Sequence, residues 1–305
     1  MTRSLRLLPI IAVVIFGSEA IADSWSVRKL SREAAGAEIA VETRKAAPVD
    51  QGLPDGLIAT YSGHGDVTAA WYGTPTRRYG HGVIGDAIEA GALHVRTSDQ
   101  TVKTFVLPKN EVFEDRYPRM ADLDGDGRVE IVTIRSSLAA GAGVTVYGLV
   151  DGTVRQRAAT PFIGRANRWL NIAGIADFRG TGDRQIAYVK TPHIGGTLLI
   201  YALRGNELEQ VGQLDGFSNH AIGSRELRLS AVVDLNQDGR MDLALPSANR
   251  RQLRFAGFDK GTLRALGAVQ LPGRVNGAIN VSGAGPGTSF VVGLEGGTIV
   301  AVTRR

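Results

Sequence analysis

A nine-residue acidic loop that occurs twice constrains the fold of this chain more than any other feature. The first copy, Asp122 to Glu130, reads DLDGDGRVE, and the second, Asp234 to Asp242, reads DLNQDGRMD. Each copy has oxygen-bearing side chains at its first, third, fifth and ninth positions and is followed by an apolar run. Alternate oxygens around a tight glycine-bearing turn suit Ca²⁺, which takes about six to eight oxygen ligands. The two loops therefore predict calcium sites that join one strand to the next.

The predicted ligands occupy the same offsets in both loops, with a backbone carbonyl at the seventh position. They are Asp122, Asp124, Asp126, the carbonyl of Arg128 and Glu130 in the first loop, and Asp234, Asn236, Asp238, the carbonyl of Arg240 and Asp242 in the second. We expect structural rather than catalytic ions, because a saturated oxygen cage leaves no open position for a substrate. The alternative is an acidic surface turn without metal.

A degenerate third copy lies between these two loops. Residues Asp177 to Gln185 read DFRGTGDRQ, so Arg179 and Thr181 replace two of the oxygen-rich side chains. The three copies begin 55 and 57 residues apart. We interpret the third copy as the same turn without its metal, and the regular period indicates repeated supersecondary units.

The remainder of the chain predicts an all-β fold. From Leu57 onward, short runs rich in Val, Ile, Thr and Tyr alternate with Gly, Asp, Asn and Pro clusters, which is typical of short antiparallel strands. Aligning these runs on the loops predicts four-stranded units. The expected strands are 83–86, 92–97, 101–107 and 111–117; 119–122, 130–136, 143–150 and 153–161; 171–177, 185–191, 197–203 and 207–214; 228–234, 242–247, 252–258 and 262–271; and 276–282, 288–294 and 298–304.

The last predicted unit lacks one strand, and residues Asp66 to Tyr72 are the expected replacement. Closing a circle of sheets with an N-terminal strand removes the exposed edges of an open array. We therefore favour a β-propeller of five four-stranded blades. Six or seven blades remain an alternative if residues 23–62 contribute further strands.

The two acidic loops, each followed by Ile131 or Leu243, resemble those of the FG-GAP or VCBS repeat family, which also builds the integrin α-subunit propeller. The resemblance covers about residues 66–305 and implies a propeller in which the metal loop joins the first two strands of a blade. The loops at Asp86, at Asp177 and at 280–285 depart from the motif, and no literal Phe-Gly/Gly-Ala-Pro signature is present. Metal binding is therefore predicted only for the two intact loops.

The N-terminus reads as an export signal. Arg3 and Arg6 precede an apolar run at 7–17, and a small-x-small site follows at Ala20-Ile-Ala22. We predict a signal peptide at 1–22, a leader or linker at 23–56 and the propeller domain at 57–305. Because the apolar run is too short to span a bilayer, we expect no membrane span after cleavage; an uncleaved anchor is the alternative. The predicted location is periplasmic or secreted.

Composition narrows the function classes. The chain has no Cys, so disulfide and thiolate chemistry are excluded. The formal charge of +5 comes from scattered Arg residues without basic runs, so specific nucleic-acid binding is not expected.

The remaining candidates lie in loops predicted to face away from the calcium loops. They are His81, Arg119, Arg168, Trp169, His193, His220 and Arg225. Such a ring suits an anionic ligand or a glycan, with Trp169 and Tyr79 as stacking surfaces. Three His could also hold zinc, although their spacing is not that of a zinc motif.

The favoured function is an exported binding module for a glycan, a protein or another envelope component. The first alternative is a hydrolase or lyase-type enzyme that uses the His and Arg loops. The second is a scaffold without a ligand. Since no known catalytic motif is visible, no catalytic residue is predicted.

Overall fold

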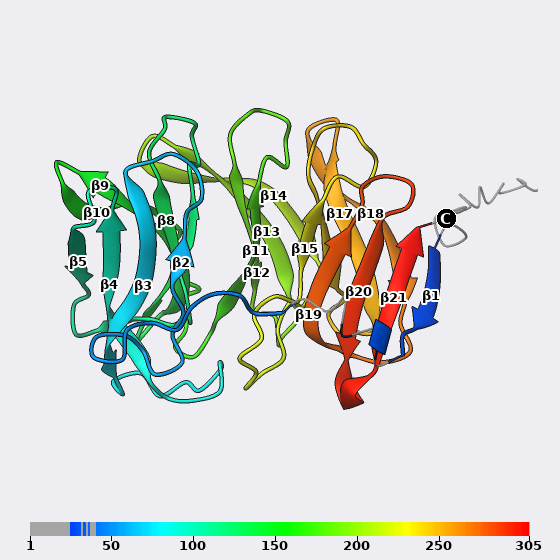
Figure 1. Ribbon diagram of the computed structural model, residues 1–305, viewed down its shortest axis with the longest axis horizontal. Helices are drawn as coiled ribbons and strands as arrows, with labels where there is room; N and C mark the ends of the chain where they lie inside the picture. Colours follow the sequence, from blue (N-terminus) through cyan, green and yellow to red (C-terminus); the bar gives the residue numbers. More distant parts are fainter. Residues whose placement is uncertain (1–24, 32, 35, 37–40, 305) are drawn as a thin grey trace, which may run out of the picture.

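The computed structural model describes residues 25–304 apart from 32, 35 and 37–40 (Figure 1). The predicted signal peptide therefore lies outside the described residues. In this part of the chain, no helix combines the length and apolarity needed to cross a bilayer.

The described strands form four antiparallel sheets, three of them four-stranded. One contains β11 (Leu170–Ala176), β12 (Gln185–Lys190), β13 (Thr197–Arg204) and β14 (Glu207–Asp215). The next contains β15 (Ala231–Val233), β16 (Asp242–Pro246), β17 (Gln252–Asp259) and β18 (Thr262–Gln270). The third contains β19 (Val275–Ser282), β20 (Ser289–Leu294), β21 (Ile299–Arg304) and β1 (Trp25–Lys29). The predictions of an all-β chain and of four-stranded antiparallel units are confirmed.

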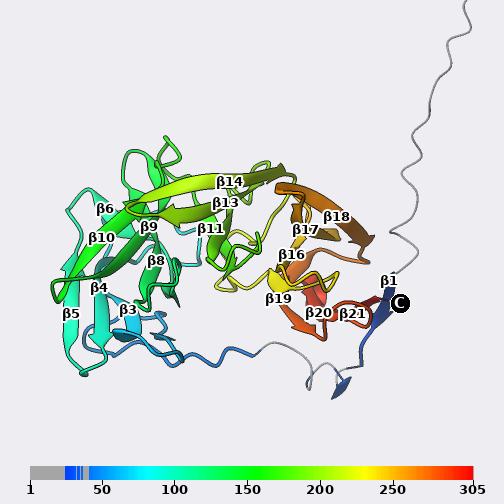
Figure 2. The ribbon, with the colours of Figure 1, turned by 90° about the horizontal axis from the view of Figure 1, so that it is seen from above.

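The fourth sheet is nine-stranded and consists of two such units joined by a short strand. The first unit holds β2 (Ala59–Thr60), β3 (Val67–Thr76), β4 (Glu89–Thr97) and β5 (Val102–Val106); the second holds β7 (Arg119–Ala121), β8 (Glu130–Ser137), β9 (Gly141–Val150) and β10 (Thr153–Ala159). Strand β6 (Glu111–Phe113) pairs with both β4 and β8. Figure 2 shows the resulting five units following one another along an arc.

Burial along the strands reflects their place in each unit. Central strands such as β8, β9 and β16 are buried over nearly their whole length, whereas β5 and β14 are mostly half-buried or exposed. The apolar core lies between neighbouring units, where for example Val144 and Val146 join a cluster with Ile186 and Tyr188. Each buried aliphatic side chain of this kind contributes roughly 1.5–3 kcal/mol by leaving water.

The strand predicted to complete the last unit is wrong. Residues 67–76 form β3 and pair with β4 in the first unit, while β1 pairs with β21, from Trp25 opposite Arg304 to Lys29 opposite Val300 (Figure 1). The ring of Trp25 stacks on Phe255 with centroids 4.5 Å apart, which anchors β1 on the neighbouring unit. Part of the predicted leader at 23–56 therefore belongs to the last sheet.

The first unit also starts one strand earlier than predicted. Residues 83–86 form turns rather than a strand, and the Asp86 loop connects β3 to β4. The first-unit counterpart of the acidic loops is instead residues 61–66, between β2 and β3. This error arose because both segments carry Gly and Asp, and only strand pairing distinguishes them.

The loops that join the first two strands of each unit are tied to one another in sequence order. The backbone N–H of Val129 donates to Asp66 Oδ1 (2.9 Å), and that of Arg184 donates to the carbonyl of Leu123 (2.8 Å). In the same way, Met241 N–H donates to the carbonyl of Asp177 (3.0 Å), and Gly285 N–H donates to that of Asp234 (3.1 Å). The first three donors stand at the eighth position of their loops. Each unit after the first is thus linked to the preceding one through these loops.

Candidate metal centre and the opposite pockets

The first acidic loop is shaped by hydrogen bonds from its own backbone. Asp122 accepts from the N–H of Gly125 (2.7 Å) and of Gly127 (3.1 Å), one with each carboxylate oxygen. Both glycines have left-handed φ values, +75° and +84°, which side-chain-bearing residues rarely adopt. The spacing of the two glycines therefore allows the chain to wrap around the Asp122 carboxylate.

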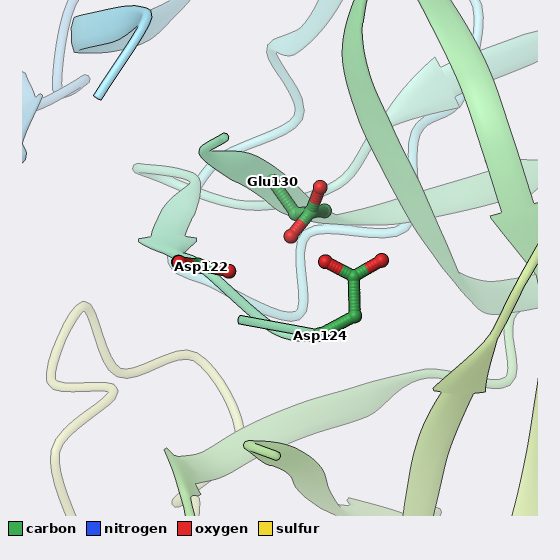
Figure 3. Close-up of side chains that lie close together, drawn as sticks. All are labelled: Asp122, Asp124 and Glu130. Atoms are coloured by element: carbon green, nitrogen blue, oxygen red, sulfur yellow. The ribbon is translucent and has the colours of Figure 1, made fainter. Parts of the chain in front are cut away.

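Three predicted ligands converge in this loop. Asp122, Asp124 and Glu130 each offer a carboxylate oxygen, and these oxygens lie within 4.8 Å of one another. Figure 3 shows the side chains of Asp124 and Glu130 approaching each other, with Asp122 beside them. Among the described residues, no other group of three or more His, Asp or Glu side chains meets this criterion. Asp126 lies outside the group and accepts from Arg128 N–H (2.8 Å).

The cluster is partly buried and only partly neutralised. Arg157 of β10 contacts Glu130 and also Asp124, the latter at 3.2 Å, and Leu123 N–H donates to Glu130 at 2.8 Å. Burial raises the pKa of Glu130 to about 7, and the neighbouring Asp124 and Asp126 carboxylates add to this rise. Asp124 Oδ1 is buried without a hydrogen-bond partner. A cation at this point would satisfy that oxygen and favour the ionised form of Glu130.

The second acidic loop has the same backbone bonds but a different side-chain arrangement. Asp234 accepts from Gly239 N–H (3.0 Å), and Asp242 accepts from Leu235 N–H (3.0 Å). However, Asp238 is ion-paired with Arg240 and also accepts from Asn236. Burial raises the pKa of Asp242 to about 6. The predicted ligands are therefore present, but they do not gather as those of the first loop do.

The third loop repeats the same turn with an amide in place of the last carboxylate. Asp177 accepts from the N–H of Thr181 (3.0 Å) and Gly182 (2.8 Å), and Gln185 Oε1 accepts from Phe178 N–H (2.9 Å). Gln185 Nε2 donates to the carbonyl of Asp183 (2.7 Å). That carbonyl is at the seventh position, where the intact loops are predicted to ligate calcium.

The predicted opposite face can be placed from the strand order. In an antiparallel four-stranded unit, the connections between first and second strands lie at one end, and those between second and third strands lie at the other. The acidic loops occupy the first end. Segments 77–88 and 191–196 join second to third strands and occupy the second end, as do 160–169 and 216–230, which lead from the fourth strand of one unit to the first strand of the next. We call the second the histidine end.

Five of the seven residues predicted for this face come together there: His81, Arg168, Trp169, His193 and His220. His193 Nε2 lies 2.9 Å from His220 Nδ1, and the Trp169 ring lies 4.7 Å from His220 and 6.1 Å from His193, centroid to centroid. His81, Trp169 and His193 line one pocket of about 340 Å³, together with Asn167, Arg168, Thr191, Ile194 and Ile222. A second pocket of about 250 Å³ shares His193 and Ile222 and includes Arg250 and Arg274.

The predicted stacking surfaces are not available to a ligand. Trp169 is 2% exposed and donates its Nε1–H to the carbonyl of Glu114 (2.9 Å), and Tyr79 is 4% exposed. Because stacking requires an open ring face, these rings support the pocket walls rather than offering a surface.

Two predicted arginines belong to ion pairs and line neither of these two pockets. Arg119 contacts the buried Asp115 and lies over the Tyr117 ring, 4.1 Å from its centroid. Arg225 pairs with Asp55 (3.1 Å) and Asp86 (2.8 Å). Of the three arginines in the prediction, only Arg168 lines the pocket of about 340 Å³ that contains His81 and His193.

Sequence reasoning missed two buried glutamates and Arg157. Glu114 lies 2.5 Å from His81 Nδ1 through Oε1, and Ser136 donates to its other oxygen. Glu89 is directly opposite Glu114, because Ala90 pairs with Phe113 in the antiparallel β4–β6 register. Nothing local marks the two glutamates, since each is an ordinary acidic residue at a strand end, and Arg157 is one of many scattered arginines.

Comparison with known proteins adds no assignment: no family model matches this chain, and no significant match to a curated protein was found.

Proposed function

We propose that this chain is an exported, calcium-stabilised β-propeller of FG-GAP or VCBS type, with five blades closed by β1. Its proposed role is to bind a glycan, a protein or another envelope component through the histidine end. The five repeated four-stranded units and their sequential loop-to-loop hydrogen bonds support the propeller. The single observation that carries the binding role is the pair of adjoining pockets around His193, at the end away from the acidic loops.

Calcium at the first loop is supported by its convergent oxygens and by the third loop. Asp122, Asp124 and Glu130 converge, and one Asp124 oxygen is buried without a partner. In the third loop, the amide N–H of Gln185 donates to the seventh-position carbonyl and, at 3.3 Å, to Thr181 Oγ1 at the fifth position. In the third loop, a hydrogen-bond donor thus faces the oxygens at the positions where we propose that a cation binds in the first loop.

The calcium proposal is tested by thermal unfolding of residues 23–305 in excess EDTA and in millimolar CaCl₂. We expect Ca²⁺ to raise Tm, because a ligand that binds only the native state stabilises it by mass action. Asp124→Ala should remove most of this rise, and Asp238→Ala should remove a smaller part. An unchanged Tm would show that Arg157 alone neutralises the first loop and would reject the metal.

The binding role is tested with an array of immobilised neutral and acidic oligosaccharides and with a cell-envelope protein extract. Ile222 lines both pockets and is 72% exposed, so Ile222→Arg should block them without disturbing the core. Val49→Arg is the matched control, because Val49 is fully exposed and lines neither pocket. Retention that is unaffected by Ile222→Arg, or absent in the wild type, would contradict the role.

One observation favours the enzyme alternative. The His81 ring is held by a buried carboxylate, which is how many general bases are oriented. A hydrolase or lyase would require turnover that is lost in His81→Gln while the Ca²⁺-dependent Tm remains, measured on the oligosaccharides retained by the array.

A further inference from the structure

The two adjoining pockets of the histidine end are lined by cations and by no carboxylate. Arg168 lines the pocket of about 340 Å³, and Arg250 and Arg274 line the pocket of about 250 Å³. Among the residues that the structure describes, no Asp or Glu lines either pocket. Because both pockets include His193 and Ile222, the three guanidinium groups belong to one pair of pockets that share a wall.

Two of these arginines have no acidic partner. Arg168 donates to the carbonyl oxygen of Asn167 (3.2 Å), and in the described part of the chain no carboxylate is ion-paired with it or with Arg274. In contrast, Arg225 at the same end pairs with Asp86 at 2.8 Å. A guanidinium without an acidic partner keeps its attraction for the oxygens of an external anion.

The third arginine, Arg250, is oriented by two hydrogen bonds. It donates to the carbonyl oxygen of Val275 (2.6 Å) and to Glu295 (3.1 Å). The Glu295 side chain is 44% exposed, and an ion pair with so exposed a partner is weak. Arg250 therefore keeps much of its charge and presents it in a fixed direction.

The charge of Arg250 acts on the paired histidines. Burial, with Arg250 next in effect, lowers the pKa of His193 to about 4. Burial lowers the pKa of His220 to about 3, and His193 and Arg250 contribute to this fall. Both rings are therefore neutral at pH 7. The positive charge on this side of the pockets comes from arginine, which stays ionised throughout the neutral range.

The rest of the lining suits a carbohydrate. Uncharged polar side chains lie between the cations, namely Asn167, Thr191, Ser218 and Asn249. The side-chain amide N–H groups of Asn167 and Asn249 donate to no other described residue, so they can bind sugar hydroxyl groups. Trp169 and Tyr79 are buried, which excludes stacking of a sugar on an aromatic face. Charge and hydrogen bonds must then supply the affinity.

We propose that the ligand of the histidine end is an acidic glycan, with carboxylate or sulfate groups on sugars that reach both pockets. Arg168 binds an acidic group in one pocket, and Arg250 and Arg274 bind one in the other. The planar guanidinium suits this task because its N–H donors match the oxygens of carboxylates and of tetrahedral oxyanions. Cations in both pockets favour a chain with repeated charges over a single small anion. This inference rests on the proposed binding role and narrows its ligand to one chemical class.

The ligand class is tested with two matched pairs of immobilised oligosaccharides. Hyaluronan carries carboxylates and is compared with its uncharged methyl ester; dextran sulfate is compared with dextran. We expect the protein to retain the acidic member of at least one pair, and the pair that responds distinguishes carboxylate from sulfate. Raising the NaCl concentration should weaken this retention. Equal retention of charged and uncharged members would overturn the inference and leave the binding role intact.

Arg168→Gln and Arg274→Gln test whether these pockets supply the charge. Each should weaken binding of the retained acidic oligosaccharide by about tenfold or more in calorimetric titration, because a charge-assisted hydrogen bond is lost. Arg155→Gln is the matched control, since Arg155 is exposed on β10, lines neither pocket and carries the same charge. An equal loss in all three variants would show that net charge alone attracts the glycan, which contradicts a built site.

A second pair of variants separates charge from size. Ile222 lines both pockets and is 72% exposed, so Ile222→Glu and Ile222→Gln should both fold. The carboxylate should repel the acidic oligosaccharide and weaken its binding at least about tenfold more than the amide does. The same affinity in both variants would reject the inference. Capture of an envelope protein without retention of either acidic oligosaccharide would also reject it, while the binding role would stand.

Discussion

Gln185 Nε2 donates a 2.7 Å hydrogen bond to the carbonyl oxygen of Asp183, inside a loop that repeats the turn of the first acidic loop. In the first loop, the residue at the position of Gln185 is Glu130, whose carboxylate has no hydrogen to donate when it is ionised. The oxygens that face into the third loop receive a hydrogen bond from Gln185. Those of the first loop face Arg157 instead, and we propose that a cation binds them as well.

The Gln185→Glu variant tests this relationship. Replacing the amide by a carboxylate removes the donor to Asp183 and Thr181 and leaves oxygens facing one another, so we expect a loss of roughly 1–3 kcal/mol of unfolding free energy without metal. Millimolar Ca²⁺ should restore part of the loss. Urea denaturation in EDTA and in CaCl₂ measures both effects. Gln213→Glu, at an exposed position of β14, is the control and should show neither.

A pH dependence is expected from Glu89. Both of its carboxyl oxygens are buried without a partner, and burial, with Glu114 next in effect, raises its pKa from 4.5 to about 10. Glu89 is therefore protonated in the folded chain at neutral pH and ionised in the unfolded chain. Its contribution to stability is complete below pH 4.5 and falls between pH 4.5 and 10, by at most about 1.4 kcal/mol per pH unit.

Glu89→Gln should remove this pH dependence, because the amide does not ionise. We expect the urea midpoint of the wild type to fall between pH 6 and pH 9, and the fall to be smaller in the variant. Glu207→Gln, on the exposed side of β14, corrects for general charge effects. Parallel pH profiles for the wild type and Glu89→Gln would show that Glu89 is ionised in the fold.

The N-terminal strand should contribute measurably to stability through Trp25. Its ring stacks on Phe255 and lies 5.9 Å from Phe290, so Trp25→Ala should cost roughly 2–3 kcal/mol. Loss of β1 would also expose the edge of β21 and promote aggregation. Chemical denaturation and light scattering measure the two effects. Val27→Ala in the same strand is the control, since Val27 is 38% exposed; equal effects of both variants would contradict the anchoring role.

Gly257 should be intolerant of any side chain because of the second acidic loop. A Cβ at this position would lie 1.9 Å from Asp242 Oδ1, so Gly257→Ala must displace that carboxylate from its bond with Leu235. We expect the free energy of unfolding to fall by about 1–3 kcal/mol. The part of the Ca²⁺-dependent rise in Tm that Asp238→Ala removes should be lost as well. Gly80→Ala is the control, because a Cβ there meets no atom within 4 Å. A variant as stable and as Ca²⁺-responsive as the wild type would show that Asp242 plays no part in the loop.

The sequence by itself determined the local features of this protein. Alternating apolar runs specify strands because successive side chains point to opposite faces, and the loop spacing specifies the turn because Gly125 and Gly127 can take left-handed conformations. These properties depend on residues close together in the chain. Four-stranded units could therefore be predicted with nearly correct boundaries from residue 119 onward.

Tertiary structure decided what depends on residues far apart. Strand β1 rather than 66–72 completes the last sheet, because pairing between chain ends is set by packing of Trp25 against Phe255, which leaves no local signal. Arg157 from β10 faces the first loop, whereas in the second Arg240 folds back onto Asp238. His81 likewise depends on Glu114, which is 33 residues away in the chain. Charges and lone pairs act through space, so their partners become known only when the sheets are packed.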